Sequence, residues 1–471
     1  MLLNILNITN LCLGILFVMC YFFQVMYLFI PFIIKMPKHK PTVPHKYAIL
    51  ISARNEEAVI GTLIDSIAQQ DYPSELVTVV VVADNCTDKT AEVARQRGAL
   101  VYERFNTEEV GKGYALNFVL HRLDEDLGPD AFDAFIVFDA DNILTKNFIT
   151  EINKTFSDGY EVITTYRNSK NYGDNWLSSG TGLWFIRESK YLNGSRFRIG
   201  ACPQVSGTGF LFSNNIKKQN DGWPYHTLTE DYEFTCDSVV KGIRFGYCED
   251  ARFYDEQVTG FVQAWHQRVR WCKGGMQAFI KHCGGLIKGI FSKKFVASYD
   301  MTMSIFPAYV ISILACFVNI IGVTALLIAG YDPIETITST LLMVLGAYLL
   351  LLTQSLVCTI TEWRHIRAKW YKKVLYAFTF PFFIFSLIPA AFVAMFKRVE
   401  WKPIKHSDAS EEERAQMEAV DEVGKRQREA DDDGDGTVGE GEGASGGEGS
   451  ADTDSEAGAD ESVSTAPATV D

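Results

Sequence analysis

The stretch Phe132-Asp-Ala-Phe-Ile-Val-Phe138, followed by Asp139-Ala-Asp-Asn142, decides the fold class of this chain. Six of its first seven residues are apolar, which is typical of a strand buried on both faces of a parallel sheet. Ligands of such sheets bind beyond the carboxyl ends of the strands. We therefore expect Asp139 and Asp141 to lie at a binding site.

Strand and helix patterns alternate on both sides of this stretch, from residue 45 to about residue 285. Short apolar runs predict strands at 47–52, 76–83, 99–102 and 132–138. Helical spacing predicts helices between them, at 56–70, 91–97 and 113–123. Repeated βα units build a parallel sheet covered by helices. The sequence therefore predicts an α/β, Rossmann-like domain over residues 45–285.

Carboxylates follow three of the predicted strands, namely Glu56, Asp84 and the pair Asp139 and Asp141. Carboxylates brought together raise one another's pKa, so such a cluster is costly unless a cation lies among them. Mg²⁺ or Mn²⁺ takes one or two carboxylates and completes its shell with phosphate oxygens and water. We expect Asp139 and Asp141 to hold such a metal, which would neutralise a diphosphate leaving group.

Further along the chain, other polar residues each allow two interpretations. Lys112, between two glycines ahead of a predicted helix, either meets a phosphate or is an ordinary loop lysine. Asp231, near a helix start, either has a role at the site or is a cap that matches the helix dipole. Gln267, Arg270 and Trp271 share one helical face, either toward a ligand or on a surface helix with a packed tryptophan.

Read in order, Asp84, Asp139-x-Asp141, Thr229-Glu230-Asp231 and Gln267-x-x-Arg270-Trp271 resemble the signature of family 2 of the glycosyltransferases, the inverting GT-A group. The resemblance covers residues 47 to 275 and implies a GT-A fold with a UDP-sugar donor. It implies donor-binding roles for Asn55, Glu56, Asp84, Lys112, Asp139, Asp141, Gln267, Arg270 and Trp271. It implies an acceptor site at Gly207, Thr208, Gly209 and Trp271, with Asp231 as the general base.

An inverting transfer needs one carboxylate to take the proton of the acceptor hydroxyl, and the resemblance assigns this role to Asp231. The acceptor is expected to be a growing polysaccharide. A single addition to a lipid, giving a glycolipid, is the alternative, and an inactive subunit of a polysaccharide export complex is a third. Tyr166 and Trp184 either stack on a sugar or belong to the core. The family favours a hexosyl or N-acetylhexosaminyl donor, and no nucleic-acid partner is expected.

Apolar runs flank this domain at both ends. Residues 1–35 predict an uncleaved transmembrane anchor, because the lysines follow the run rather than precede it. Residues 301–398 predict about three transmembrane helices, with residues 286–300 as an interfacial helix before them. The basic residues after the anchor and in 363–373 place the catalytic domain on the cytoplasmic side of the cell membrane. Pro381 and Pro389 leave open a re-entrant last segment.

The C-terminal residues differ in charge from the rest. From His406 on there are 21 acidic and 4 basic residues, against 37 acidic and 40 basic before it. Residues 407–471 cannot bury a core and are predicted to be disordered. Within them, residues 431–442 match the calcium-loop formula of the EF-hand, although chance matches are easy in so acidic a run. The 10 cysteines form no C-x-x-C pair, so neither a zinc knuckle nor a disulfide framework is indicated.

Overall fold

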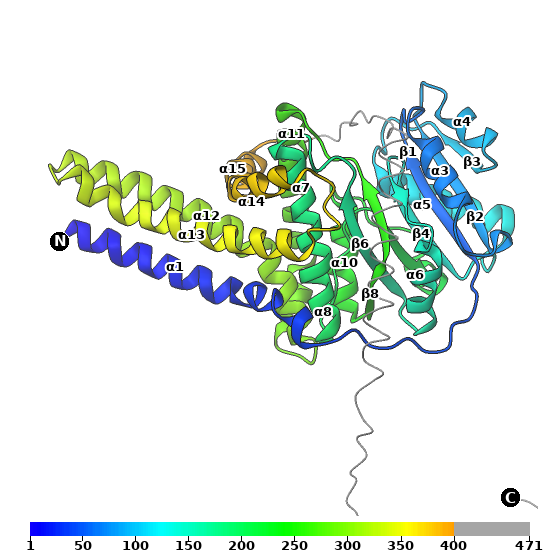
Figure 1. Ribbon diagram of the computed structural model, residues 1–471, viewed down its shortest axis with the longest axis horizontal. Helices are drawn as coiled ribbons and strands as arrows, with labels where there is room; N and C mark the ends of the chain where they lie inside the picture. Colours follow the sequence, from blue (N-terminus) through cyan, green and yellow to red (C-terminus); the bar gives the residue numbers. More distant parts are fainter. Residues whose placement is uncertain (400–471) are drawn as a thin grey trace, which may run out of the picture. The chain divides into compact units, whose positions relative to one another are not determined.

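The computed structural model describes residues 1–399, apart from the side chains of Ile305 and Phe306 (Figure 1). The predicted disordered tail and the candidate calcium loop lie outside these residues. An eight-stranded mixed sheet has the strand order β3-β2-β1-β4-β7-β6-β8-β5. Its strands are β1 (Tyr47–Ala53), β2 (Val77–Asp84), β3 (Leu100–Arg104), β4 (Ala134–Asp139), β5 (Ile143–Leu144), β6 (Val162–Ser169), β7 (Phe210–Ser213) and β8 (Phe245–Asp255).

The four strands predicted from apolar runs form one parallel group in this sheet, and β6 and β8 form another. Strand β1 pairs with β2 and β4, and β2 pairs with β3, all in parallel. Alternate residues face opposite covering helices: Leu50 packs in the core with α5 (Lys112–Leu127), whereas Ile49 packs with α3 (Ile60–Ala68). Strand β7 then joins β4 in antiparallel orientation. The α/β fold predicted from the sequence is confirmed.

Further helices pack around this sheet, and the sheet with helices α3 to α11 is called the α/β unit. Helices α4 (Thr90–Gln96) and α6 (Phe148–Ser157) cover the face that α3 covers. After β6 come α7 (Trp176–Ile186), a π-helical segment η2 (Arg187–Asn193) and α8 (Gly194–Arg198). The remaining helices are α9 (Asn214–Asn220), α10 (Glu230–Lys241) and α11 (Phe261–Ile290).

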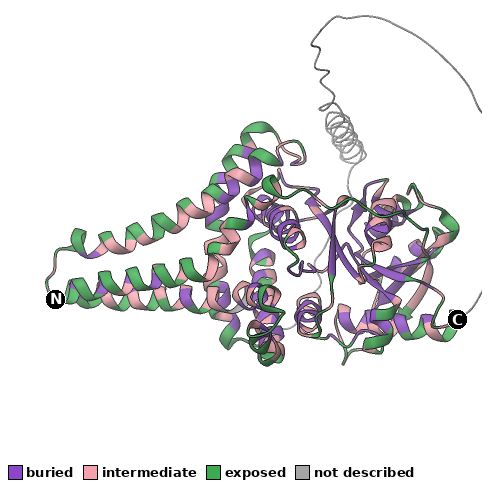
Figure 2. Cartoon of the chain, turned by 90° about the horizontal axis from the view of Figure 1, so that it is seen from below, coloured by how far each residue is buried: buried purple, intermediate pink, exposed green. Residues whose placement is uncertain are grey.

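Four helical segments of the described chain are long and apolar enough to cross a membrane: Leu2–Ile33, Phe295–Ile328, Pro333–Thr361 and Trp370–Phe396. They comprise α1 (Leu2–Tyr27) with the short α2 (Ile30–Ile33), α12 (Phe295–Ile328), α13 (Pro333–Thr361), and α14 (Trp370–Phe385) with α15 (Leu387–Phe396). Helices α1, α12 and α13 lie side by side and extend away from the sheet (Figure 1). Their outer side chains are exposed, as at Ile8, Ile321 and Leu341, each more than 60% exposed (Figure 2).

Two segments differ from their expected form. Residues 286–300 are not a separate interfacial helix: α11 continues to Ile290 because its apolar face still packs at Leu286, and α12 begins at Phe295. The last apolar run is broken at Ser386 into α14 and α15. Helix α14 packs against α7, and α15 packs against α11.

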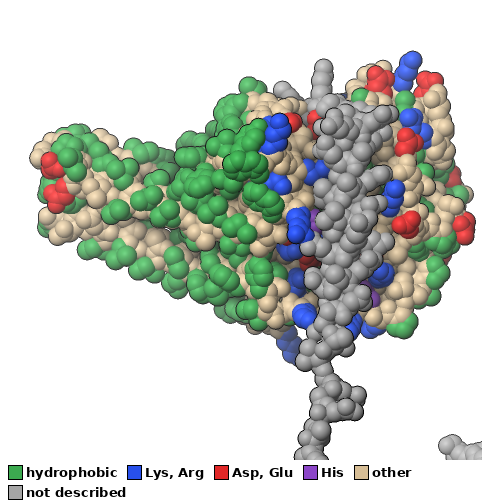
Figure 3. All heavy atoms as spheres, viewed as in Figure 1, with side chains coloured by type: hydrophobic (Ala, Val, Ile, Leu, Met, Phe, Trp, Pro, Cys, Tyr) green, Lys and Arg blue, Asp and Glu red, His purple; other side chains and the backbone are tan. Residues whose placement is uncertain are grey.

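Buried polar contacts join the apolar helices to the α/β unit. Arg196 of α8 forms a bidentate ion pair with Asp300 of α12, at 2.9 and 3.0 Å, and Tyr27 of α1 donates to the same carboxylate at 2.8 Å. Beyond α13, Glu362 pairs with Lys190 at 2.9 Å. Figure 3 shows hydrophobic side chains over the surface of these apolar helices. Lysines and arginines lie where the helices meet the α/β unit.

Candidate active site

A cavity of about 2040 Å³ opens at the carboxyl ends of β1, β2 and β4. Ten of the thirteen residues that the sequence singled out line it: Glu56, Asp84, Lys112, Asp139, Asp141, Gly207, Asp231, Gln267, Arg270 and Trp271. They come from seven separate stretches of the chain. The parallel sheet and helices α5, α10 and α11 thus bring the candidate donor, base and acceptor residues to one space.

The other three candidates, Asn55, Thr208 and Gly209, support the wall of the cavity without lining it. Asn55 adopts a positive φ of 58°, and its side-chain oxygen accepts the Thr87 N–H at 2.8 Å. The Thr208 hydroxyl accepts the Asp139 N–H at 2.9 Å. A Cβ on Gly209 would lie 2.0 Å from the Phe253 ring, so only glycine fits there. These residues fix the loops that carry the cavity's side chains.

Lys112 and Asp139 form an ion pair at the rim of the cavity. Lys112 starts α5, and its Nζ also donates to the Gly207 carbonyl at 2.8 Å. The Asp139 side chain remains 41% exposed. Asp84, by contrast, is buried and accepts from Arg104 at 2.8 Å. A cation and a helix N-terminus therefore stand where a diphosphate could bind.

A second charged group beside Asp141 was missed by the sequence reasoning. Asp255, at the end of β8, accepts from the Arg167 Nε at 2.8 Å, while Arg167 Nη1 donates to the Ser206 carbonyl at 2.6 Å. Burial, opposed by Arg167 and increased by the charge of Asp141, raises the pKa of Asp255 to about 6. The position of Asp255 at a strand end was the signal that could have identified it.

The residues of this corner fit a divalent cation that arrives with a diphosphate. Among residues 1–399, no group of three or more His, Cys, Asp or Glu side chains is placed to hold a metal by itself. One oxygen of Asp141 accepts the Glu256 N–H at 2.8 Å, which fixes the carboxylate. Magnesium and manganese need only one or two carboxylates when phosphate oxygens supply other ligands. Asp139 and Asp141 meet that requirement.

Asp231 lies in the first turn of α10, facing Gly207. A Cβ on Gly207 would lie 3.6 Å from Asp231 Oδ2, so the glycine leaves room beside this oxygen. Burial raises the pKa of Asp231, although Lys112, Arg270 and Arg167 oppose the shift. Burial and the neighbouring Asp231 raise the pKa of Glu230 to about 7. The two carboxyl groups titrate as a pair, and one of them is available to accept a proton near neutral pH.

Gln267, Arg270 and Trp271 share the cavity-facing side of α11. Arg270 Nη1 donates to the Leu228 carbonyl at 3.1 Å, which ties α11 to the loop before α10. The Trp271 ring meets Phe185 edge-to-face, with the ring centres 6.0 Å apart. The helical spacing predicted from the sequence is therefore present, and it delivers one cation and one indole to the cavity.

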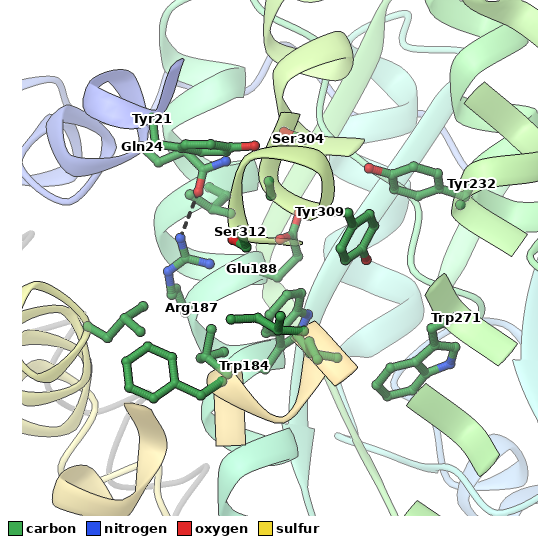
Figure 4. Close-up of a pocket in the computed structure, with 18 of the residues that line it drawn as sticks. Tyr21, Gln24, Trp184, Arg187, Glu188, Tyr232, Trp271, Ser304, Tyr309 and Ser312 are labelled. Atoms are coloured by element: carbon green, nitrogen blue, oxygen red, sulfur yellow. Dashed lines mark hydrogen bonds between the residues drawn. The ribbon is translucent and has the colours of Figure 1, made fainter. Parts of the chain in front are cut away.

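Tyr166 and Trp184, the two aromatic candidates, fall in different places. Tyr166 is fully buried and donates to Glu362 at 2.6 Å, outside the cavity lining, which agrees with the core interpretation. Trp184 lines the cavity (Figure 4). Around it lie Tyr21, Tyr232 and Tyr309, so this part of the cavity is aromatic.

Beyond Trp184 the cavity continues along the apolar helices. Its walls there are mostly apolar side chains of α1, α12 and α13, including Leu11, Ile15, Val18, Ile311, Ala315, Met343, Ala347, Leu350 and Leu351. Polar side chains return farther along, at Asn10, Asn319 and Glu335. One continuous space therefore joins the carboxylates at the sheet edge to the helices.

Comparisons with known proteins agree with this geometry. Residues 44–274 match the family described as Glycosyltransferase like family 2. A beta-monoglucosyldiacylglycerol synthase from Synechocystis sp. is 27% identical over 248 residues, 51% of this chain and 50% of that protein. A poly-beta-1,6-N-acetyl-D-glucosamine synthase from Staphylococcus epidermidis is 21% identical over 297 residues, 59% of this chain and 65% of that protein. The chain thus spans about half to two thirds of the length of these curated relatives.

A solved structure shares the fold. The mannosyltransferase PcManGT from Pyrobaculum calidifontis, in complex with GDP-Man and Mn²⁺, has a TM-score of 0.55 and 17% sequence identity. The match covers 84% of this chain and 98% of that one. The chain therefore belongs to family 2 of the glycosyltransferases, and its α/β unit has the GT-A fold.

Proposed function

We propose that this chain transfers a sugar, with inversion, from a nucleotide-diphosphate donor to a lipid acceptor at a membrane surface. One observation carries the proposal: the cavity that holds the candidate carboxylates continues into a space walled by apolar side chains of α1, α12 and α13. The first half of that space suits a charged donor, and the second half suits a hydrocarbon chain.

On the donor side, Glu56 and Asp84 lie at the ends of β1 and β2, where the nucleoside would bind. Lys112 and Arg270 are the cations that would face the diphosphate. Asp139 and Asp141 would hold Mg²⁺ or Mn²⁺, which would supply positive charge to the departing diphosphate. Gln267 and Trp271 would complete the wall between donor and acceptor.

On the acceptor side, Asp231 is the proposed general base. Its carboxylate would take the proton of an acceptor hydroxyl while that oxygen attacks the anomeric carbon and the bond to the diphosphate breaks. The raised pKa of this carboxyl strengthens it as a base at neutral pH. Gly207 supports the assignment because it leaves Oδ2 uncovered on the cavity side.

The apolar walls favour a lipid over the polysaccharide expected from the signature. A sugar polymer needs hydrogen-bonding partners along its path, whereas the cavity offers a run of Val, Ile, Leu, Met and Ala side chains between Trp184 and Asn319. One relative is named as a glucosyldiacylglycerol synthase, which supports the lipid. Another is named as a polysaccharide synthase, so polymer formation is the alternative outcome of the test.

We also propose that α14 and α15 do not cross the membrane, so that both ends of this segment stay on the catalytic side. The break at Ser386 and the packing of α14 on α7 and of α15 on α11 support this topology. Lys372 and Lys373 at one end and Lys397 at the other give both ends positive charge. Helices α1, α12 and α13 would then be the spans, with the α/β unit cytoplasmic.

The decisive experiment is product analysis. The purified chain in lipid nanodiscs that contain diacylglycerol would be incubated with radiolabelled UDP-glucose, UDP-N-acetylglucosamine or GDP-mannose. The expected product is one labelled species that extracts into organic solvent and carries a single sugar. A ladder of water-soluble products would establish the polymer instead. Absence of nucleotide release with every donor, lipid extracts included, would remove the catalytic proposal.

A second measurement tests the metal. Chelation by EDTA is expected to stop transfer, and Mg²⁺ or Mn²⁺ to restore it, because the diphosphate would otherwise leave without a Lewis acid. The variant Asp141→Asn is expected to need more metal for half-maximal activity. Full activity of the unaltered chain in EDTA would contradict the assignment of Asp139 and Asp141.

A further inference from the structure

Arg187 is a buried arginine that lines the cavity between Trp184 and the apolar helices (Figure 4). It is 9% exposed and begins the π-helical segment η2. Its Nε donates to Gln354 of α13 at 2.8 Å, and its Nη2 donates to Gln24 of α1 at 2.9 Å. Both partners are neutral amides, so they orient the guanidinium without neutralising it.

Arg196 is a second buried arginine in the same wall, and carboxylates neutralise its charge. Arg196 binds Asp300 through two nitrogens and Glu188 through a third, at 2.7 Å. Glu188 follows Arg187 in the chain, yet its ion pair is with Arg196. Within residues 1–399, no carboxylate lies at ion-pair distance from Arg187. Two buried cations thus share the two carboxylates unequally: Arg196 forms ion pairs with both, whereas Arg187 forms an ion pair with neither.

A buried cation without an ion-pair partner is expensive. Burial lowers the pKa of the Arg187 guanidinium and the nearby charge of Glu188 opposes this only in part, but an arginine stays charged in proteins. Such a cost is typical of a site that receives its anion from a ligand. The π-helical geometry of η2 points the same way, since π-bulges are frequent at functional sites.

The cavity walls next to Arg187 indicate what accompanies the anion. On α13, Leu351, Leu350 and Ala347 precede Gln354 by three, four and seven residues, which forms one helical stripe in the cavity. On α1, Tyr21 and Phe17 precede Gln24 in the same way. The α13 stripe is apolar from Leu342 to Leu351, about 14 Å of helix at 1.5 Å per residue, and becomes polar at Thr340, Ser339, Thr338 and Glu335.

We propose that Arg187 binds the phosphate of an anionic lipid acceptor, with the lipid chain lying between α1, α12 and α13. The lipid's reacting hydroxyl then lies on the Trp184 side, toward Asp231. A guanidinium meets phosphate with two parallel hydrogen bonds, which fixes the headgroup as well as its charge. This inference rests on the proposed function, because it names the class of acceptor for that reaction.

The test uses the full-length chain in phosphatidylcholine nanodiscs that contain equal amounts of phosphatidylglycerol, which has a phosphate and free hydroxyls, and diacylglycerol with the same acyl chains. Native mass spectrometry after gentle release would measure which lipid stays bound. The expected preference for phosphatidylglycerol is at least about tenfold, the effect of one charge-assisted hydrogen bond. The variant Arg187→Gln is expected to abolish the preference, and Arg187→Lys to keep part of it.

Two controls distinguish specific binding at Arg187 from a general attraction of the chain to anionic lipid. Lys293, exposed beside the start of α12 and outside the cavity, provides the matched variant Lys293→Gln, which is expected to keep the full preference. Thermal unfolding of Arg187→Gln is expected to change much less than that of Arg196→Met, because Arg187 loses two hydrogen bonds to neutral amides and no ion pair. Inorganic phosphate is expected not to displace the lipid.

Several results would overturn the inference. These are equal retention of the two lipids by the unaltered chain, an unchanged preference in Arg187→Gln, an equal loss in Lys293→Gln, or displacement by inorganic phosphate. Failure of the proposed function gives a different result: no nucleotide release with any donor, whatever lipid is retained. If neutral diacylglycerol accepts sugar as well as phosphate-bearing lipids do, transfer stands and the role of Arg187 falls.

Discussion

The donor half and the acceptor half of the cavity are built in different ways. The donor half collects side chains from the ends of β1, β2 and β4. Its charges are paired mostly within short stretches, Lys112 with Asp139 and Asp84 with Arg104, and one pair, Arg167 with Asp255, joins distant strands. The acceptor half is walled by helices from both ends of the described chain, and its charges are paired between distant segments. The first is a property of the parallel sheet, whereas the second exists only when α1, α12 and α13 are docked.

The contrast between the donor half and the acceptor half is tested most strongly at Asp231, where the two halves meet. The variant Asp231→Asn is expected to lower the transfer rate by about 10²–10⁴-fold, the usual effect of losing a general base, while nucleotide binding persists. Single-turnover assays and calorimetry with UDP measure the two effects separately. Asp237→Asn, on the same helix but outside the cavity, is the matched control. Near-normal turnover of Asp231→Asn would leave the two halves without a shared catalytic residue.

Stability should respond most in the acceptor half, at the pair that docks α12. The variant Arg196→Met leaves the buried Asp300 and Glu188 without their cation and is expected to cost about 3–5 kcal/mol. Asp300→Asn should cost less, because Arg196 keeps Glu188. Thermal unfolding in detergent measures both, and Arg187→Gln serves as the comparison with no ion pair to break. Equal unfolding temperatures for Arg196→Met and Arg187→Gln would contradict the distinction between the two arginines.

The pH dependence of the transfer rate is a finer test of the place where the donor and acceptor halves meet. Because burial raises the pKa of Asp231, and the pKa of Glu230 lies at about 7, the pair binds a proton below neutral pH. A proton on Asp231 occupies the base, so the transfer rate is expected to fall as pH decreases through the raised pKa of Asp231 and to level off above it. Glu230→Gln removes the neighbouring charge and should move this decline to lower pH. An unchanged profile in that variant would show that the two groups titrate independently.

The donor half was largely predictable from the sequence, and the acceptor half was not. The carboxylates after the strands at 47–52, 76–83 and 132–138 follow from strand periodicity and from the rule that parallel strands present one common edge. The sequence did not predict the role of Asp255, because its partner Arg167 lies 88 residues away. It did not predict the role of Asp300 either, because Arg196 lies 104 residues away. No local pattern reports such pairs. The break at Ser386 was only suggested by two prolines.

The smallest expected effect lies at the far end of the acceptor half. Asn10 of α1 and Asn319 of α12 exchange side-chain hydrogen bonds at 3.0 and 2.9 Å, and Thr340 of α13 adds a third helix to the contact. Interhelical hydrogen bonds in membranes average about 0.6 kcal/mol. Asn319 takes part in three such bonds, so Asn319→Leu is expected to lower stability by up to about 2 kcal/mol and to leave UDP affinity unchanged. Thermal unfolding and UDP calorimetry measure the two effects, and a change in UDP affinity would mean that the halves are coupled through the bundle rather than only at Asp231.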